Sequence, residues 1–405
     1  MKVLKKIYGI ALGFTSFCTF VYAKPKVSIS IWADTGNIPL VEKRLEDFKA
    51  VYAKEAIFNF TVLQQSSSTC GTTVLANPEL AADIFTFADD QFKLLMNKKL
   101  LLQVTDNPER VIEENGGMKS NLIKNCTQDG KLYAYPELTG NGYFLYYNKK
   151  YISNSDAKSM DKILDSCVKN GKKFTMDMKN GWYLYSFFKG AGLDVYENPD
   201  GSNFCNWNAT NTKISGLEVA KGILRIANNP GFICLENEEF VKQVSDGEIV
   251  AAINGAWNAN FLSKQWGKDF GATKLPTYTV KGSQAQMASF SGYKLVGIKA
   301  NTEYPEWAMK VAMWLTNAKS QNLLFEATGE CPANTTLAAS PIIQKSPAVM
   351  ALSEQAKYST VQRVGLYYWD PSRILGVVLS EGGYMSDSDI QMHLDTTVRK
   401  IKTGK

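Results

Sequence analysis

Polar side chains that can bind hydroxyl or amine groups follow two apolar, strand-like runs near the start of the chain. The first group follows residues 27–32 and the second follows residues 83–87. The first group is Asp34 and Asn37, and the second is Asp89, Asp90 and Gln91. Phe87, which directly precedes the second group, is a further expected ligand contact through its aromatic ring. Carboxylates and amides exchange hydrogen bonds with the edge of a sugar. These two groups are therefore candidate contacts for a small polar ligand.

Tryptophans stand beside polar or glycine residues at three later positions. A flat aromatic ring packs well against the C–H faces of a sugar. The positions are Trp182 after Asn180-Gly181, Trp257 after Asn254-Gly255, and Trp369 with Arg373 four residues further on. We expect Trp182, Asn254, Trp257, Trp369 and Arg373 to contact ligand.

Each candidate also has a purely structural interpretation. The three tryptophans could be core residues packed between helix and sheet. Asp34 and Asp90 could cap the helices that follow them, although a cap and a ligand contact are compatible. Arg373 could form a structural ion pair. These alternatives stay open at the level of sequence.

The same residues also allow other ligands and activities. Acids at 34, 89 and 90 together with the tryptophans could surround a polyamine. Arg373 and helix N-termini could bind a polyol phosphate. Two carboxylates could act in a glycoside hydrolase, or the protein could be a surface adhesin. Residue types alone do not choose among these ligands and activities.

Composition excludes several classes of function. The chain has 405 residues, of which 45% are hydrophobic and 21% charged, as in a soluble globular protein. Its one histidine, His393, makes a transition-metal site or a histidine base improbable, and we expect no metal and no cofactor. Without the three lysines at its start, the chain carries 42 basic against 39 acidic residues. This balance gives no basis for nucleic-acid binding.

The first 23 residues have the pattern of a cleavable signal peptide. A basic head with Lys2, Lys5 and Lys6 precedes an uncharged apolar stretch at 7–21, and Val21-Tyr22-Ala23 fits a signal peptidase. The pattern predicts export to the periplasm. Cys18 follows Phe17, where a lipoprotein would have a small residue, so a lipid anchor is the less favoured alternative.

Six cysteines remain after the signal peptide, and an even number in an exported chain favours disulfides. Six cysteines allow 15 pairings. Cys205 and Cys234 flank one predicted helix, and this pair is the preferred disulfide.

Alternating strand and helix patterns supply the elements that position these residues. Strands are expected at 27–32, 58–63 and 83–87, with helices at 39–52 and 72–80 between them. This order predicts a parallel sheet covered on both faces, with ligand at the carboxyl ends of its strands. A second α/β section follows the link at 139–142. Along the rest of the chain, helices are expected at 156–170, 181–190, 213–228, 236–245, 257–266, 304–317 and 318–328, and strands at 173–177, 248–253, 270–274 and 292–298. The last part, 346–402, is expected to be mainly helical.

Five segments in this order resemble the bacterial extracellular solute-binding proteins of the maltose-binding type. They are residues 82–92, 130–136, 147–149, 247–257 and 270–276. The chain departs from that family's pattern at Phe87, where tryptophan is frequent, and at Gln91, where arginine is frequent. The cysteines are also atypical.

The resemblance implies a two-lobed α/β fold of the periplasmic-binding-protein type, with strands that cross between the lobes. It implies an N-terminal lobe of residues 24–138 with 297–333, and a C-terminal lobe of 139–296 with 334–405. It further implies that a mono- or oligosaccharide, the preferred ligand, binds in the cleft and that the lobes close around it without catalysis, so we expect no enzymatic activity. The monomeric protein is then expected to deliver the sugar to the permease of an ABC transporter.

Overall fold

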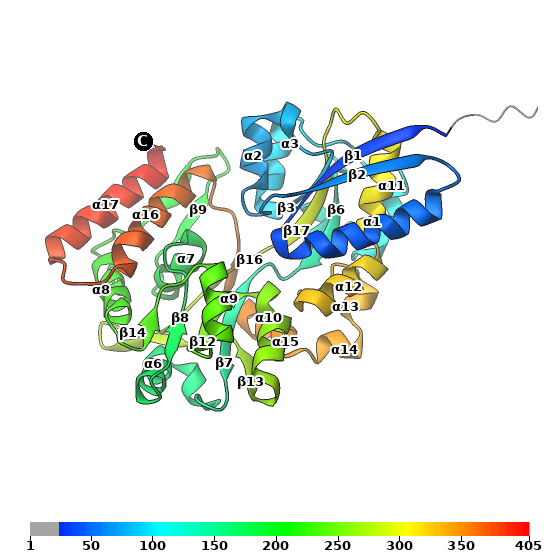
Figure 1. Cartoon of the computed structure of the whole chain (residues 1–405). Coiled ribbons are helices and arrows are strands. Elements are labelled where there is room, and N and C mark those ends of the chain that lie inside the picture. The colour runs from blue at the N-terminus through cyan, green and yellow to red at the C-terminus, as the bar shows by residue number, and fades with distance from the viewer. Residues whose placement is uncertain (1–23, 405) are drawn as a thin grey trace, which may run out of the picture.

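The computed structural model of the protein describes residues 24–404. The predicted signal peptide, including Cys18, lies outside the described residues. Two α/β lobes stand side by side, each built on its own five-stranded sheet (Figure 1). The predicted fold class is confirmed. The lobe boundaries stay a prediction.

The first lobe is built on a mixed sheet. Its strands, in spatial order, are β2 (Ile57–Gln64), β1 (Lys26–Ala33), β3 (Ile84–Ala88), β17 (Tyr293–Ile298) and β6 (Ala134–Thr139). Strand β1 runs parallel to β2 and β3, whereas β17 is antiparallel to β3 and β6. Val27, Ile29 and Ile31 alternate on the buried face of β1, as the sequence pattern requires.

Helices cover this sheet and connect its strands. They are α1 (Ile38–Tyr52), α2 (Cys70–Ala76), α3 (Phe92–Asn97), α4 (Pro108–Glu114), α5 (Asn121–Lys124), α11 (Pro305–Thr316), α12 (Ala318–Thr328), α13 (Thr335–Ala338) and α14 (Pro341–Gln344). Helix α1 contacts β2, and α11 contacts both β17 and β6. The carboxyl ends of β1 and β3 lead directly into short 3₁₀ helices, η1 (Thr35–Asn37) and η3 (Asp89–Gln91).

The second lobe repeats this construction. Its sheet has the order β11 (Phe232–Ile233), β8 (Lys173–Thr175), β12 (Ile249–Gly255), β7 (Tyr143–Asn148) and β13 (Phe270–Thr273). Strand β8 is parallel to β11 and β12, and β7 is antiparallel to β12 and β13. The 3₁₀ helix η5 (Ala256–Asn258) continues from the end of β12.

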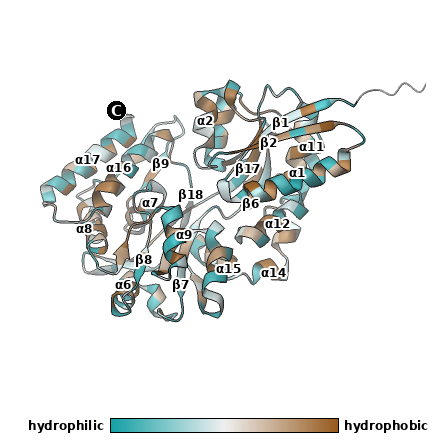
Figure 2. Ribbon diagram, viewed as in Figure 1, coloured by the Kyte–Doolittle hydropathy of each residue, from teal (hydrophilic) through white to brown (hydrophobic). Residues whose placement is uncertain are grey.

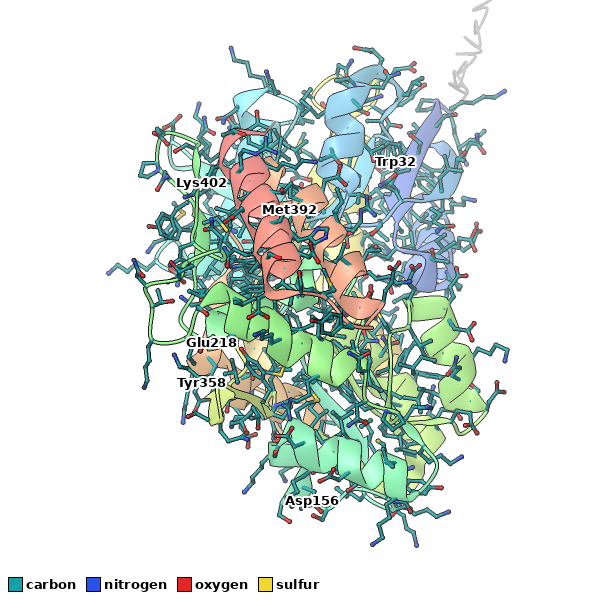
Figure 3. The ribbon with its side chains drawn as sticks, turned by 90° about the vertical axis from the view of Figure 1, so that its left-hand side faces the viewer. Trp32, Asp156, Glu218, Tyr358, Met392 and Lys402 are labelled. Carbon is teal, nitrogen blue, oxygen red and sulfur yellow. The ribbon has the colours of Figure 1, made fainter. Side chains whose placement is uncertain are left out.

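Eight helices of the described chain surround the second sheet. They are α6 (Met160–Lys169), α7 (Gly181–Gly190), α8 (Gly216–Ala227), α9 (Asn237–Ser245), α10 (Ala259–Trp266), α15 (Pro347–Gln355), α16 (Trp369–Ser380) and α17 (Asp387–Thr403). Helix α7 is apolar on nearly all sides because it is buried from Gly181 to Phe188. Helix α17 lies on the outside of the lobe, where Met392 and Lys402 mark its length (Figure 3).

Short strand pairs complete the two lobes and the region between them. They are β4 (Thr127–Gln128) with β5 (Lys131–Leu132), β9 (Val195–Glu197) with β10 (Asn203–Cys205), β14 (Thr277–Val280) with β15 (Ser283–Gln286), and β16 (Ser289–Ser291) with β18 (Ser359–Val361). The chain passes between the lobes from β6 to β7, from β16 to β17 and from α14 to α15 (Figure 1).

Buried apolar residues form a core inside each lobe. On the ribbon coloured by hydropathy, outer helices such as α1 and α17 alternate between hydrophilic and hydrophobic stretches (Figure 2). One core lies around the first sheet, and two cores lie around the second. In the described residues no helix is both long and apolar enough to cross a membrane.

Candidate functional site

The carboxyl ends of both sheets border a large cleft with a volume of about 1800 Å³. Loops that follow β1, β3, β8 and β12 contribute residues to its walls. Of the predicted ligand contacts, eight line this cleft: Asp34, Asn37, Asp90, Gln91, Trp182, Trp257, Trp369 and Arg373. The structure therefore brings together side chains that are up to about 340 residues apart in sequence, although their contact with ligand stays a prediction.

Asp34 has its hydrogen bonds satisfied within the protein. Its carboxylate accepts from the Ser67 backbone N–H at 2.8 Å and from the Ser67 hydroxyl at 2.9 Å. Lys294 Nζ lies 3.3 Å from Asp34 Oδ2. Burial raises the pKa of Asp34, but Lys294 and the two Ser67 hydrogen bonds outweigh burial and lower it overall. Asp34 does not cap the helix that follows it.

Lys294 is a buried ammonium on the floor of the cleft. Its Nζ also lies 3.1 Å from Glu330 Oε1, and both residues line the cleft. Burial lowers the pKa of Lys294, but Glu330, Asp34 and Glu137 raise it well above its ordinary value. Lys294 therefore carries a fixed positive charge that the neighbouring carboxylates balance.

Asp89 does not line the cleft, contrary to the expected ligand contact. Its Oδ2 accepts from Arg363 at 2.8 Å, and its Oδ1 accepts from the Tyr293 backbone N–H at 2.8 Å. Arg363 also donates to Asn125 at 2.9 Å. A Cβ atom on Gly292 would lie 2.6 Å from Asp89 Oδ1, so only glycine fits there. Asp89 thus joins the first lobe to the segment that follows β18.

Asp90, the next residue, does line the cleft and has one carboxylate oxygen, Oδ1, without a partner among the described residues. Burial and the neighbouring Asp89 raise the pKa of Asp90 to about 7, although Gln362 and Arg363 favour its charged form. It can accept a hydrogen bond from a ligand hydroxyl.

Gln91 lines the cleft but its side chain is used to hold the loop before α2. Its Nε2 donates to the Ser67 carbonyl at 2.8 Å and to the Ser68 carbonyl at 3.2 Å, and its Oε1 accepts from the Gly71 backbone N–H. Because Ser67 in turn binds Asp34, Gln91 positions that carboxylate indirectly.

Phe87 is fully buried in the core of the first lobe and does not reach the cleft. It lies on β3, which β1 and β17 flank on either side, and its ring contacts Phe85. A central strand has both faces covered, so its last aromatic residue packs inside. The expected contact between Phe87 and ligand is corrected accordingly.

The second lobe presents two stacked tryptophans to the cleft. The rings of Trp182 and Trp257 lie 5.7 Å apart with an interplanar angle of 21°. Trp182 Nε1 donates to Gln362 Oε1 at 2.7 Å, which fixes the ring. The Trp257 ring lies directly over Gly255, where a Cβ would come within 2.2 Å of it. Glycine at 255 therefore lets the indole lie flat against the backbone.

Asn254 does not line the cleft. Its Oδ1 accepts from the Tyr183 hydroxyl at 3.0 Å and from the Gly255 backbone N–H at 2.7 Å. It belongs to the support of the tryptophan wall rather than to its surface. The expected direct contact between Asn254 and ligand is corrected on this point.

Trp369 and Arg373 line the cleft from the start of α16. The Trp369 ring makes an edge contact with Tyr368 at 5.1 Å. Arg373 is exposed and lies 3.4 Å from Asp370, one turn earlier on the same helix. The ion-pair interpretation of Arg373 matches this geometry, and such an exposed pair contributes little to stability.

Several cleft residues were not among the sequence candidates. They are Asp177, Tyr183, Lys294, Glu330, Gln362 and Arg363. Asp177 follows β8, so the rule that selected Asp34 and Asp90 would have found it. Its Oδ1 has no partner within the described part of the chain, and burial together with Glu236 raises the pKa of Asp177 to about 6.

The expected disulfide between Cys205 and Cys234 is wrong. The structure has free thiols at all six described cysteines. Cys205 ends β10 before α8 begins, and Cys234 follows β11 after α8 ends. Cys205 lies beside Trp207, whereas Cys234 lies beside Met178 and Lys179, so the two thiols have different neighbours.

Comparison with known proteins agrees with this architecture. A family model described as bacterial extracellular solute-binding protein matches residues 43–351. The galactooligosaccharide-binding protein of Bacillus subtilis (strain 168) is 27% identical over 295 residues, which make up 68% of this chain and 66% of the relative. The chain spans about half to two thirds of the length of the curated relatives it matches.

Solved structures share the fold across nearly the whole chain. A structure with acarbose has a TM-score of 0.81 and 23% identity, and the match covers 94% of this chain and 99% of that one. The maltotriose binding protein of Thermus thermophilus, bound with maltotriose, has a TM-score of 0.75 and 16% identity, with 93% and 99% covered. The family match, which covers more than half of the chain, and the two-lobed fold agree: the chain belongs to the family of bacterial extracellular solute-binding proteins.

Proposed function

We propose that this protein is the exported solute-binding component of an ABC transporter, which captures an oligosaccharide between its lobes and delivers it to a membrane permease. The observation that carries the proposal is the cleft itself, where stacked tryptophans of one lobe face carboxylates of the other. Indole faces suit the C–H faces of sugar rings, and carboxylates accept from their hydroxyls.

The size of the cleft favours a ligand of more than one ring. A drug-sized molecule occupies a pocket of roughly 300–1,000 Å³. The volume of about 1800 Å³ leaves room for several sugar units between Trp257 and Trp369. The galactooligosaccharide-binding protein and the maltotriose binding protein named above support the same class of ligand.

Charge pairing in the cleft supports a neutral ligand over a polyamine. Two of the three acids that could have formed an amine site already have cationic partners. Asp34 is paired with Lys294, and Asp89 is paired with Arg363. A polyol phosphate has less support still, because Arg373 is paired with Asp370 and the cleft retains acids such as Asp177.

We further propose that the protein binds without catalysis and acts as a monomer in the periplasm. The relatives are named as binding proteins. The signal-peptide pattern at the start of the chain supports export.

Isothermal titration calorimetry of the mature chain tests this proposal. Maltotriose, galactotriose, spermidine and glycerol 3-phosphate form the panel, and wild type is compared with Trp257→Ala and Trp307→Phe. Trp307 packs in the first lobe against Phe58 and provides the matched control. We expect saturable binding of one trisaccharide, at least about tenfold weaker in Trp257→Ala and unchanged in Trp307→Phe.

Binding of spermidine alone, weakening with salt, would instead support the cationic ligand. Release of smaller sugars during the titration, detected by chromatography, would contradict the proposal that the protein has no catalytic activity.

A further inference from the structure

The floor of the cleft contains a buried carboxylate whose hydrogen bonding is incomplete. Glu330 is only 3% exposed and Lys294 only 6% exposed, yet both line the cleft. Glu330 Oε1 lies 3.1 Å from Lys294 Nζ. Glu330 Oε2 has no hydrogen-bond partner among residues 24–404. A buried carboxylate oxygen without a donor is costly, so such an oxygen calls for an explanation.

The ammonium beside it also has capacity left. Lys294 has three N–H donors. The structure pairs its Nζ with two carboxylate oxygens, Glu330 Oε1 and Asp34 Oδ2. One donor direction is therefore left for a further acceptor. Lys294 can therefore donate to a ligand oxygen while Glu330 Oε2 accepts from a neighbouring ligand hydroxyl.

An aromatic face adjoins this donor and acceptor. Lys294 Nζ lies 5.4 Å from the centroid of the Trp257 ring. Gly255 and Trp182 hold that ring in place from the second lobe. A donor, an acceptor and an aromatic face thus meet at one point. Two adjacent hydroxyls and the face of a single sugar ring match this arrangement.

Resting on the proposed function, we propose that Lys294 and Glu330 form a diol-binding pair that determines which sugar ring is accepted over Trp257. One hydroxyl accepts a hydrogen bond from Lys294 Nζ, and the adjacent hydroxyl donates to Glu330 Oε2. A ring that lacks either hydroxyl leaves one of these buried groups without a partner and is rejected.

Monodeoxy sugars test the pair directly. Calorimetry measures the affinity of maltotriose, galactotriose and their monodeoxy derivatives for wild type, Glu330→Gln and Glu326→Gln. Glu326 is exposed on α12, outside the cleft lining, and provides the control. Wild type should bind its trisaccharide roughly tenfold to a hundredfold more tightly than each of two deoxy derivatives, one lacking the hydroxyl at Lys294 and one lacking the hydroxyl at Glu330. Glu330→Gln should lose the discrimination against the second derivative, and Glu326→Gln should behave as wild type.

Glu330→Gln could instead lower the affinity for the unmodified trisaccharide and for every deoxy derivative by the same factor. That result would show that Glu330 has only a structural role, and it would overturn the inference but leave the proposed function intact. Failure of wild type to bind any trisaccharide would overturn the proposed function and the inference with it. Glu330→Asp keeps the charge beside Lys294 but withdraws the carboxylate. Glu330→Asp is used if thermal unfolding shows that Glu330→Gln is misfolded. We expect Glu330→Asp to lose the same discrimination between the trisaccharide and the second deoxy derivative.

Discussion

At the scale of single residues, the buried acids of the first lobe differ in how their charge is balanced. Lys294 lies within ion-pair distance of Asp34 and Glu330, but Glu137 has no comparable contact. Glu137 Oε2 has no partner within the described chain. Burial raises the pKa of Glu137 to about 8. The positive charge of Lys294 only partly offsets this effect, and the negative charges of Glu330 and Asp34 add to it.

The raised pKa of Glu137 predicts a specific pH dependence of stability. The carboxyl titrates near pH 4.5 when unfolded and near 8 when folded. Between these values the unfolded chain has lost a proton that the folded chain keeps, so the free energy of unfolding falls with rising pH by up to about 1.4 kcal/mol per pH unit. Glu137→Gln removes this contribution. Urea unfolding should show the variant gaining stability relative to wild type from pH 5 to pH 8.

Glu326→Gln, an exposed change of the same chemistry, should show no such gain. If the free energies of unfolding of wild type and Glu137→Gln changed with pH in parallel, Glu137 would be ionised in the folded protein throughout this range.

The polar residues that follow strand ends predicted part of the site. Whether each of them faces the cleft depends on how deeply it is buried in the folded lobe. Asp34 and Asp90 point to the cleft from loops after β1 and β3. Asp89 and Phe87 turn inward because β3 lies in the middle of its sheet. Lys294 and Glu330 gave no local signal, since their roles depend on contacts with segments remote in sequence, such as the 260 residues between Lys294 and Asp34.

At the scale of elements, helix α8 shows how closely a helix start can approach another segment. Ser215 and Glu218 form a capping box at its N-terminus. The backbone N–H of Gly216 donates to the Ala209 carbonyl at 2.9 Å. A Cβ atom at Gly216 would lie 1.8 Å from the Trp207 carbonyl oxygen. Only glycine fits at position 216, because a Cβ would clash with a backbone oxygen, which cannot move aside as the end of a side chain can.

Gly216→Ala should therefore lower the free energy of unfolding by about 3 kcal/mol, since α8 must move away from the segment around Trp207. Urea unfolding of the variant gives this difference. Gly36→Ala, where nothing lies within 4 Å of the added Cβ, is the matched control and should change stability by less than about 0.5 kcal/mol. Equal stability of the two variants would contradict the close packing described for Gly216.

Long periodic elements were predictable, whereas short ones were not. The expected helices at 39–52 and 181–190 correspond to α1 and α7, and the expected strand at 27–32 corresponds to β1. The hairpin β9–β10 and strand β18 were missed because each strand has only three residues, too few to show a period. Yet the segment after β18 carries Gln362 and Arg363, which hold Trp182 and Asp89.

At the scale of the whole molecule, contacts between the lobes lie close to the chain crossings. Arg363 reaches Asp89 from the segment after β18, and Lys294 faces Trp257 from β17. Lys93 of the first lobe also lies 3.7 Å from Glu197 of the second, and both residues line the cleft between the lobes. Such an arrangement favours rotation of one lobe against the other, with the crossing segments as the hinge. The family resemblance implied the two lobes, whereas the side-chain contacts between them could not be predicted from the sequence.

A crystal structure of the mature protein with the trisaccharide that binds in calorimetry tests the central claim most directly. We predict that the sugar lies between the lobes, with one ring against Trp257, hydroxyls bound to Asp90 and Glu330, and a narrower cleft than in the present structure. A trisaccharide bound outside the cleft, or inside it without contact to Trp257 or Trp182, would contradict the account.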